Sequence, residues 1–151
     1  MEFILTKELG RLAKWLRVLG FDAVYFKEDN KSVLLLEALR QGRIILTRNQ
    51  KISKERGIKV ININSQNLKE QLRQLKEELK LTLDGEKMFS RCVICNLELE
   101  YIEKEKIKGK VPEYVFKTQD NFYICEGCKR IYWQGTHWGN VSQIIKELGI
   151  N

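Results

Sequence analysis

The chain has 151 residues, of which 43% are hydrophobic, 31% charged and 9% aromatic, with ten Gly and one Pro. This composition is typical of a globular protein and excludes a disordered, collagen-like or membrane-spanning chain. Lys and Arg outnumber Asp and Glu by 27 to 20, and the formal net charge of +7 favours a polyanionic partner. Charged residues appear at Lys7 and Glu8, too early for a signal-peptide core, so we expect a cytoplasmic protein without a membrane partner.

Short apolar runs alternate with helical patterns along the first half of the chain. The runs predict strands at 2–5, 24–26, 43–47 and 59–63. Apolar residues, mostly leucines, at spacings of three and four predict helices at 9–19, 33–41 and 66–81. Gly20 and Gly42 end the first two helices, and residues 29–32 offer N-caps for the second. The alternation predicts an α/β fold with a mostly parallel sheet flanked by helices.

The pattern changes at 82–87, where helical periodicity stops and the cysteine-containing part begins. We therefore predict an α/β domain at 1–85 and a smaller module at 86–138. The module has room for β-hairpins at 98–108 and 111–117. A last helical pattern predicts a terminal helix at 139–151 that packs on the body of the protein.

The four cysteines form two pairs, Cys92-x2-Cys95 and Cys125-x2-Cys128, separated by 29 residues. Each pair can form a tight knuckle, and two knuckles complete a tetrahedral thiolate shell with no open position for substrate. This spacing predicts a C-terminal zinc ribbon with a structural Zn²⁺. Redox thiols and an iron–sulfur cluster are the alternatives, and their usual cysteine spacings fit less well.

Aromatic residues and the one histidine follow the second cysteine pair. His137 is expected to fix the edge of the ribbon through a hydrogen bond; zinc ligation and a surface role in binding or proton transfer are the alternatives. Tyr132, Trp133 and Trp138 fit a small core beside the zinc better than a surface on which RNA bases stack.

Four stretches of sequence together resemble the Mut-seven C-terminal RNase domain family. They are LGRLAKWLRVLGFD (9–22), GRIILTRN (42–49), SRCVICN (90–96) and CEGCKRIYWQGTH (125–137). The resemblance implies a PIN-like nuclease domain that carries a C-terminal zinc ribbon and acts on RNA. It also implies carboxylates at the carboxyl ends of the parallel strands, which hold Mg²⁺ or Mn²⁺ in such nucleases.

The chain departs from the family at these acidic positions. Thr6 and Asn49 occupy positions where the family has Asp. The acidic pair that the family has before the second helix falls on Asn30 and Lys31, with only Asp29 alongside. The resemblance therefore points to Thr6, Asp29 and Asn49 as site positions with too little negative charge to hold a dication firmly. Glu8 or Glu37 can add charge if the fold brings them near. Asp22 is expected to be a loop or cap residue.

Basic residues recur on one side of the first predicted helix. Lys7, Arg11, Lys14 and Arg17 follow one another at spacings of four, three and three, and Arg43 and Arg48 flank the third strand. Such a cluster suits RNA phosphates, although a solvated helix face explains the spacing equally well.

Three functions remain open from the sequence. The first is a metal-dependent ribonuclease whose acidic site is depleted. The second is a non-catalytic RNA-binding protein of the same fold, and the third is a protein-interaction module. The sequence makes no prediction of the oligomeric state.

Overall fold

The computed structural model describes residues 1–52, 57–134, 143, 145 and 146. Four parallel strands form the first sheet, in the order β2-β1-β3-β4. The strands are β1 (Glu2–Thr6), β2 (Asp22–Phe26), β3 (Ile44–Thr47) and β4 (Val60–Asn62). The helices between and after them are η1 (Lys7–Leu9), α1 (Gly10–Val18), α2 (Lys31–Gln41) and α3 (Leu68–Leu79). The predicted α/β class and its mostly parallel sheet are confirmed.

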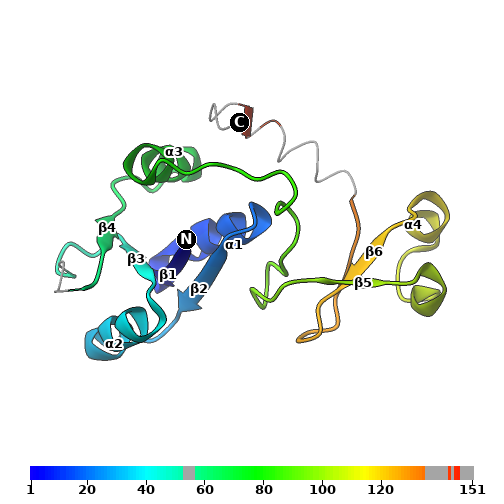
Figure 1. Cartoon of the computed structure of the whole chain (residues 1–151), viewed down its shortest axis with the longest axis horizontal. Coiled ribbons are helices and arrows are strands. Elements are labelled where there is room, and N and C mark those ends of the chain that lie inside the picture. Colours follow the sequence, from blue (N-terminus) through cyan, green and yellow to red (C-terminus); the bar gives the residue numbers. More distant parts are fainter. Residues whose placement is uncertain (53–56, 135–142, 144, 147–151) are drawn as a thin grey trace.

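Helices cover both faces of this sheet, and Figure 1 shows α2 and α3 on opposite sides of it. Side chains alternate between the faces because successive residues of a strand point in opposite directions. Phe3, Leu5 and Leu46 pack with α1 and α3 in one core. Ile4 and Ile45 point the other way and pack with α2 in a second core. The strands read as continuous apolar runs because both faces are buried.

Local capping explains where the helices begin and end. Asn30 caps α2 by accepting a hydrogen bond from the amide of Val33 at 3.1 Å, and Asn67 caps α3 in the same way. Gly42 ends α2 in the left-handed conformation at φ 66°, which glycine adopts without a steric penalty. The predicted caps of α2, within 29–32 and at Gly42, are confirmed.

The second sheet is small and antiparallel, with the order β5-β6-β7. Its strands are β5 (Glu100–Ile102), β6 (Phe122–Ile124) and β7 (Ile131–Tyr132). The helices η2 (Lys104–Ile107) and α4 (Glu113–Thr118) bury Ile107 and Val115 against Phe122. The hairpin predicted at 111–117 is wrong, because Pro112 lies directly before a helix, where its missing N–H leaves no hydrogen bond unmade. The hairpin predicted at 98–108 is also wrong, because β5 is followed by η2 and pairs with β6 instead.

Arg17 joins the two sheets. Its side chain is only 7% exposed, and Nε donates to the carbonyl of Ala23 at 2.9 Å. Nη1 donates to the carbonyls of Val93 and Ile94, at 2.8 and 3.1 Å. Since Val93 and Ile94 lie between Cys92 and Cys95, Arg17 holds the first cysteine knuckle against the α/β part.

Asn96 completes this joint from the other side. Its Oδ1 accepts from the amide of Ala23 at 3.0 Å, and its Nδ2 donates to Oδ1 of Asp22 at 2.6 Å. Asp22 also accepts from Arg43 at 2.8 Å. Asp22 begins β2, so it is a bridging residue of a strand and not the loop or cap residue that the sequence suggested.

The chain approaches itself closely where α1 ends. Gly20 has φ 96°, and a Cβ placed on it would lie 2.4 Å from the carbonyl oxygen of Lys87. The amide of Phe89 donates to the carbonyl of Val18 nearby, at 2.9 Å. Only glycine fits there, so the same residue ends α1 and admits the chain that leads to the cysteines.

The terminal helix predicted at 139–151 falls largely outside the described residues, as do His137 and Trp138. Residues 143, 145 and 146 are helical, and Ile145 packs against the core formed with α1 and α3. No helix in the described part of the chain is long and apolar enough to cross a membrane.

The joint predicts a specific sensitivity of the fold. Replacing Arg17 with Met keeps the apolar stem but leaves three carbonyls without this donor, and each buried acceptor left unpaired costs about 1–3 kcal/mol. We expect Arg17→Met to lower the free energy of unfolding by at least about 2 kcal/mol in urea titrations. Arg11→Met, on the exposed side of α1, should change it by less than about 0.5 kcal/mol. Equal effects of the two changes would contradict this role of Arg17.

Candidate functional site

Polar side chains follow one another across the carboxyl ends of β1, β3 and β4. Thr6 and Thr47 end β1 and β3, and their hydroxyl oxygens lie 2.9 Å apart. Thr47 is in register with Asn62 at the end of β4. The carboxyl ends of parallel strands are where α/β sheets build ligand sites, so this row is the candidate site.

Glu8 supplies the negative charge of this edge. It lies in η1, two residues beyond the end of β1, and its Oε1 accepts from the hydroxyl of Thr6 at 2.6 Å. The same oxygen lies 3.2 Å from the hydroxyl of Thr47 and 2.9 Å from the amide nitrogen of Arg48. Partial burial opposes the charged form, but these hydrogen bonds outweigh it and hold the pKa of Glu8 below its ordinary value.

Of the other predicted site positions, Asp29 is engaged elsewhere, whereas Asn49 contacts the site through its backbone, because its amide donates to the Thr47 hydroxyl at 3.0 Å. Oδ1 of Asp29 lies 2.7 Å from the ammonium group of Lys7, and both side chains are exposed. Oδ1 of Asn49 accepts from the amide of Lys51 at 3.0 Å and so shapes the turn after β3. Of the three predicted positions, only Thr6 contacts a carboxylate, and that carboxylate is Glu8.

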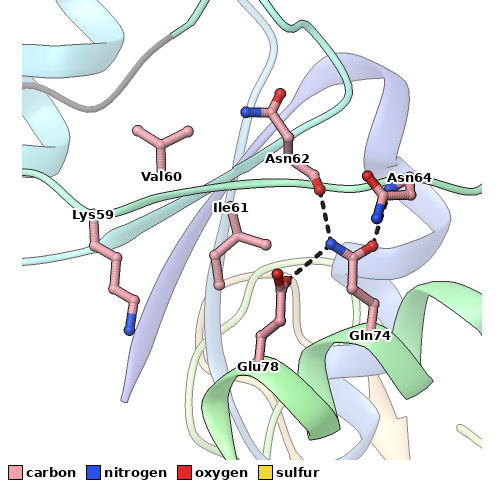
Figure 2. Close-up of a pocket in the computed structure, with 7 residues that line it drawn as sticks. All are labelled: Lys59, Val60, Ile61, Asn62, Asn64, Gln74 and Glu78. Atoms are coloured by element: carbon pink, nitrogen blue, oxygen red, sulfur yellow. Dashed lines mark hydrogen bonds between the residues drawn. The ribbon is translucent and has the colours of Figure 1, made fainter.

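Asn62 has a side-chain oxygen that is buried without a hydrogen bond among the described residues. Its Oδ1 is buried and, among the described residues, is the one buried side-chain nitrogen or oxygen that has no hydrogen-bond partner. Figure 2 shows the Asn62 side chain leaving β4 on the side opposite Ile61 and Gln74. Its acceptor therefore belongs to the face on which Thr47 and Thr6 lie.

A cleft of about 510 Å³ lies along the open edge of β4, beside α3, and Asn62 and Gln74 are among the residues that line it. Gln74 fills the open edge of the strand there, because its amide donates to the carbonyl of Asn62 at 2.7 Å and accepts from the amide of Asn64 at 2.9 Å. These are the groups that a further parallel strand would use. The side chain of Gln74 thus protects part of the sheet edge from pairing with another chain.

The predicted basic face divides into two parts. Lys7, Arg11 and Lys14 are exposed along the start of α1. Arg17 is buried in the joint, and the guanidinium of Arg43 donates to the carbonyl of Phe3 at 3.1 Å and to Asp22. Arg17 is therefore not on the exposed face that its spacing predicted, because a spacing of three or four residues does not distinguish a solvated position from a buried one. Arg43 lies before β3, at the edge of the sheet opposite the carboxyl ends, and does not border the candidate site.

The four cysteines lie at the opposite end of the sheet, close to the start of β2. Their Sγ atoms are all within 4.8 Å of one another, and those of Cys92 and Cys128 are 3.7 Å apart. Tetrahedral Zn–S bonds of about 2.3 Å place neighbouring sulfurs roughly 3.8 Å apart, so the donor set fits a metal ion such as zinc. No other group of three or more acidic, Cys or His ligands is found among the described residues.

The two knuckles share one backbone geometry. The residue after each pair, Asn96 or Lys129, has a positive φ of 67° or 62°, and its amide donates to the carbonyl of the first cysteine. Burial works against the Cys92 thiolate, but hydrogen bonds from the Tyr132 hydroxyl and from backbone amides lower its pKa to about 7. A thiolate at neutral pH is the form that binds a metal ion.

The aromatic residues of the ribbon pack inside it. The Tyr132 hydroxyl lies 3.0 Å from Sγ of Cys92, and Trp133 packs edge-on against Phe122 at a centroid distance of 6.4 Å. The interpretation of Tyr132 and Trp133 as packing residues is therefore supported over base stacking.

Sequence reasoning named Glu8 only as a helper and missed Asn62. The available signals were weak, because one is an acid two residues beyond a strand and the other an amide at a strand end. Asn62 reaches this edge because β4 pairs with β3, and the pairing of strands distant in sequence cannot be read from one sequence.

Comparison with known proteins agrees with this architecture. The family model of the Mut7-C RNAse domain matches residues 1–145, which is nearly the whole chain. No match to a curated protein or to a solved structure was found. The match spans both the parallel sheet and the four-cysteine cluster, and this chain belongs to the Mut7-C RNase domain family.

Proposed function

We propose that this chain binds RNA at the carboxyl edge of its parallel sheet and hydrolyses it only weakly, as a ribonuclease with a depleted metal site. The observation that carries the proposal is the Thr6 hydroxyl, which donates to Glu8 where the family resemblance expects an Asp. Membership of an RNase domain family supports RNA as the substrate or partner.

The loops at this edge favour a polyanion. Residues 7–8, 27–31 and 48–51 follow the carboxyl ends of β1, β2 and β3, and they carry five basic and three acidic side chains. The basic ones are Lys7, Lys27, Lys31, Arg48 and Lys51. Because η1 and α1 start here, Arg11 and Lys14 extend the positive surface along the helix. Phosphates are the ligands that such a surface attracts.

The charge at the edge explains why hydrolysis is expected to be weak. A divalent ion in such a nuclease activates water and neutralises charge on the phosphate. The oxygen donors of Thr6, Glu8, Thr47 and Asn62 fit a hard dication by type, but they include one carboxylate only. The protein's own contribution is to hold these oxygens in a row and to bind the phosphates beside them.

A second candidate is an RNA-binding protein that has no hydrolytic activity. Thr6 and Asn49 favour it, because both are neutral and both are already engaged in intramolecular hydrogen bonds. The two functions share the RNA surface and differ in whether a metal ion binds beside it.

We propose structural zinc for the four cysteines. Such sites contribute about 10–16 kcal/mol of apparent binding energy, and here the first knuckle also bonds to Arg17. We expect elemental analysis to find about one zinc per chain. Removing the metal with a chelator should unfold the second sheet and lower the urea concentration at which the first sheet unfolds. Added Zn²⁺ should restore the second sheet and the stability of the first. Finding iron, or less than about half an equivalent of zinc in undamaged protein, would contradict the assignment.

The RNA surface is tested by charge reversal on α1. We expect Arg11→Glu with Lys14→Glu to weaken binding of a single-stranded RNA about tenfold at low salt, measured by fluorescence anisotropy, with less effect at high salt. The matched control is Lys106→Glu with Lys108→Glu, two exposed residues around η2 in the other sheet. An equal loss of affinity in the control would mean that RNA does not bind at α1, or that binding depends only on the net charge of the protein.

Hydrolysis is tested by restoring the acids. We expect Thr6→Asp with Asn49→Asp to raise RNA cleavage in Mn²⁺ by roughly a hundred- to a thousand-fold, the effect of one strong charge stabiliser. The double variant should also lose stability without metal, because a second carboxylate would face Glu8. Thr6→Asn is the neutral control of similar shape. Rapid Mn²⁺-dependent cleavage by the unaltered protein would contradict the depleted site.

A further inference from the structure

Four oxygen-bearing side chains converge at the carboxyl ends of β1, β3 and β4. The hydroxyl oxygens of Thr6 and Thr47 are 2.9 Å apart, and both contact Oε1 of Glu8. Asn62 is the in-register neighbour of Thr47. Neighbouring strands are about 4.8 Å apart and in-register side chains share a face, so Oδ1 of Asn62 belongs to the same group.

One acceptor in this group lacks a donor. Oδ1 of Asn62 is buried without a hydrogen bond among the described residues. Glu8 lies at the surface, and the hydrogen bonds from Thr6, Thr47 and Arg48 all end on its Oε1. A buried acceptor without a donor is costly, and native proteins rarely leave one unless a water or an ion completes it.

The chemistry of the group selects the ligand. All four members offer oxygen, with no nitrogen or sulfur ligand, and one of them is ionised at neutral pH. Oxygen donors of this kind suit hard cations such as Mg²⁺ and Mn²⁺, whereas zinc and softer metals prefer Cys and His. The four thiolates at the opposite end of the sheet provide the site for a soft metal.

We propose that Glu8 is the carboxylate ligand of a weak divalent-cation site in this chain, with Asn62 as its buried neutral ligand and Thr6 and Thr47 holding the carboxylate in place. Compared with the family pattern, the carboxylate lies two residues further along the chain, at Glu8 in η1 instead of at Thr6. This inference rests on the proposed function, since the cation would lie beside the RNA phosphates. It makes Glu8, rather than Asp29, the acid of the site.

The test is Mn²⁺ binding, followed by electron paramagnetic resonance of free Mn²⁺, on the full chain with its cysteine site loaded with zinc. Glu8→Gln keeps an oxygen to accept from Thr6, Thr47 and Arg48 and removes only the charge, so the fold should persist. We expect it to weaken Mn²⁺ binding at least about tenfold. Glu28→Gln, an exposed acid in the loop after β2, is the control and should leave affinity within about twofold.

Asn62→Ala tests whether Asn62 is a metal ligand or a residue that stabilises the fold. Because Oδ1 makes no hydrogen bond among the described residues, its removal should not lower the thermal midpoint, yet it should weaken Mn²⁺ binding severalfold. If Glu8→Gln and Glu28→Gln weaken binding equally, or if Asn62→Ala unfolds the protein with no loss of affinity in the folded fraction, the proposal is overturned.

RNA affinity without added Mn²⁺ distinguishes this proposal from the function on which it rests. If RNA binds but the unaltered protein takes up no Mn²⁺ at about ten millimolar, the cation site is wrong and the non-catalytic RNA-binding function stands. If Mn²⁺ binds through Glu8 but single-stranded RNA does not bind, the cation site stands and the RNA function fails.

Discussion

The carboxyl edge of the sheet depends on the hydrogen bonds that converge on one oxygen of Glu8. The hydroxyls of Thr6 and Thr47 and the amide of Arg48 bring the ends of β1 and β3 and the loop after β3 to a single charged group. Without that carboxylate, two buried hydroxyls and an amide would lose their shared acceptor. Because the surrounding loops are mostly basic, we expect this edge to attract phosphate groups more strongly than several metal ions.

The opposite edge of the parallel sheet, at the start of β2, is connected to the cysteine cluster. Arg17, Asp22 and Asn96 connect the start of β2 to the first cysteine knuckle through side chains that are largely buried. The distance from Asp22 to Phe26 along β2 is four residues, or roughly 13 Å, so a metal ion held by the cysteines lies far from Glu8. The four-cysteine cluster and the candidate site at the carboxyl ends of the strands are therefore separate places in the fold.

Periodicity was enough to predict the first sheet and its helices, because strands buried on both faces and leucine stripes give strong local signals. The cysteine spacing predicted the clustering of the four cysteines for the same reason. The hairpin predicted at 111–117 was wrong because β-like residues there pack as a helix on Phe122. Arg17 and Arg43 were misplaced because burial of a guanidinium depends on carbonyls distant in sequence. Asn62 was not placed beside Thr47 because strand register cannot be read from one sequence.

The most direct measurement is anomalous diffraction from crystals of the zinc-loaded protein soaked in Mn²⁺. We expect a manganese peak within ligand distance of Glu8 and Asn62, at about 2.0–2.6 Å from their oxygens. We also expect zinc, and no manganese, among the four cysteines. A manganese peak at Asp29 with none beside Glu8, or a fully soaked crystal with no peak at this edge, would contradict the claim that Glu8 is the acid of this site.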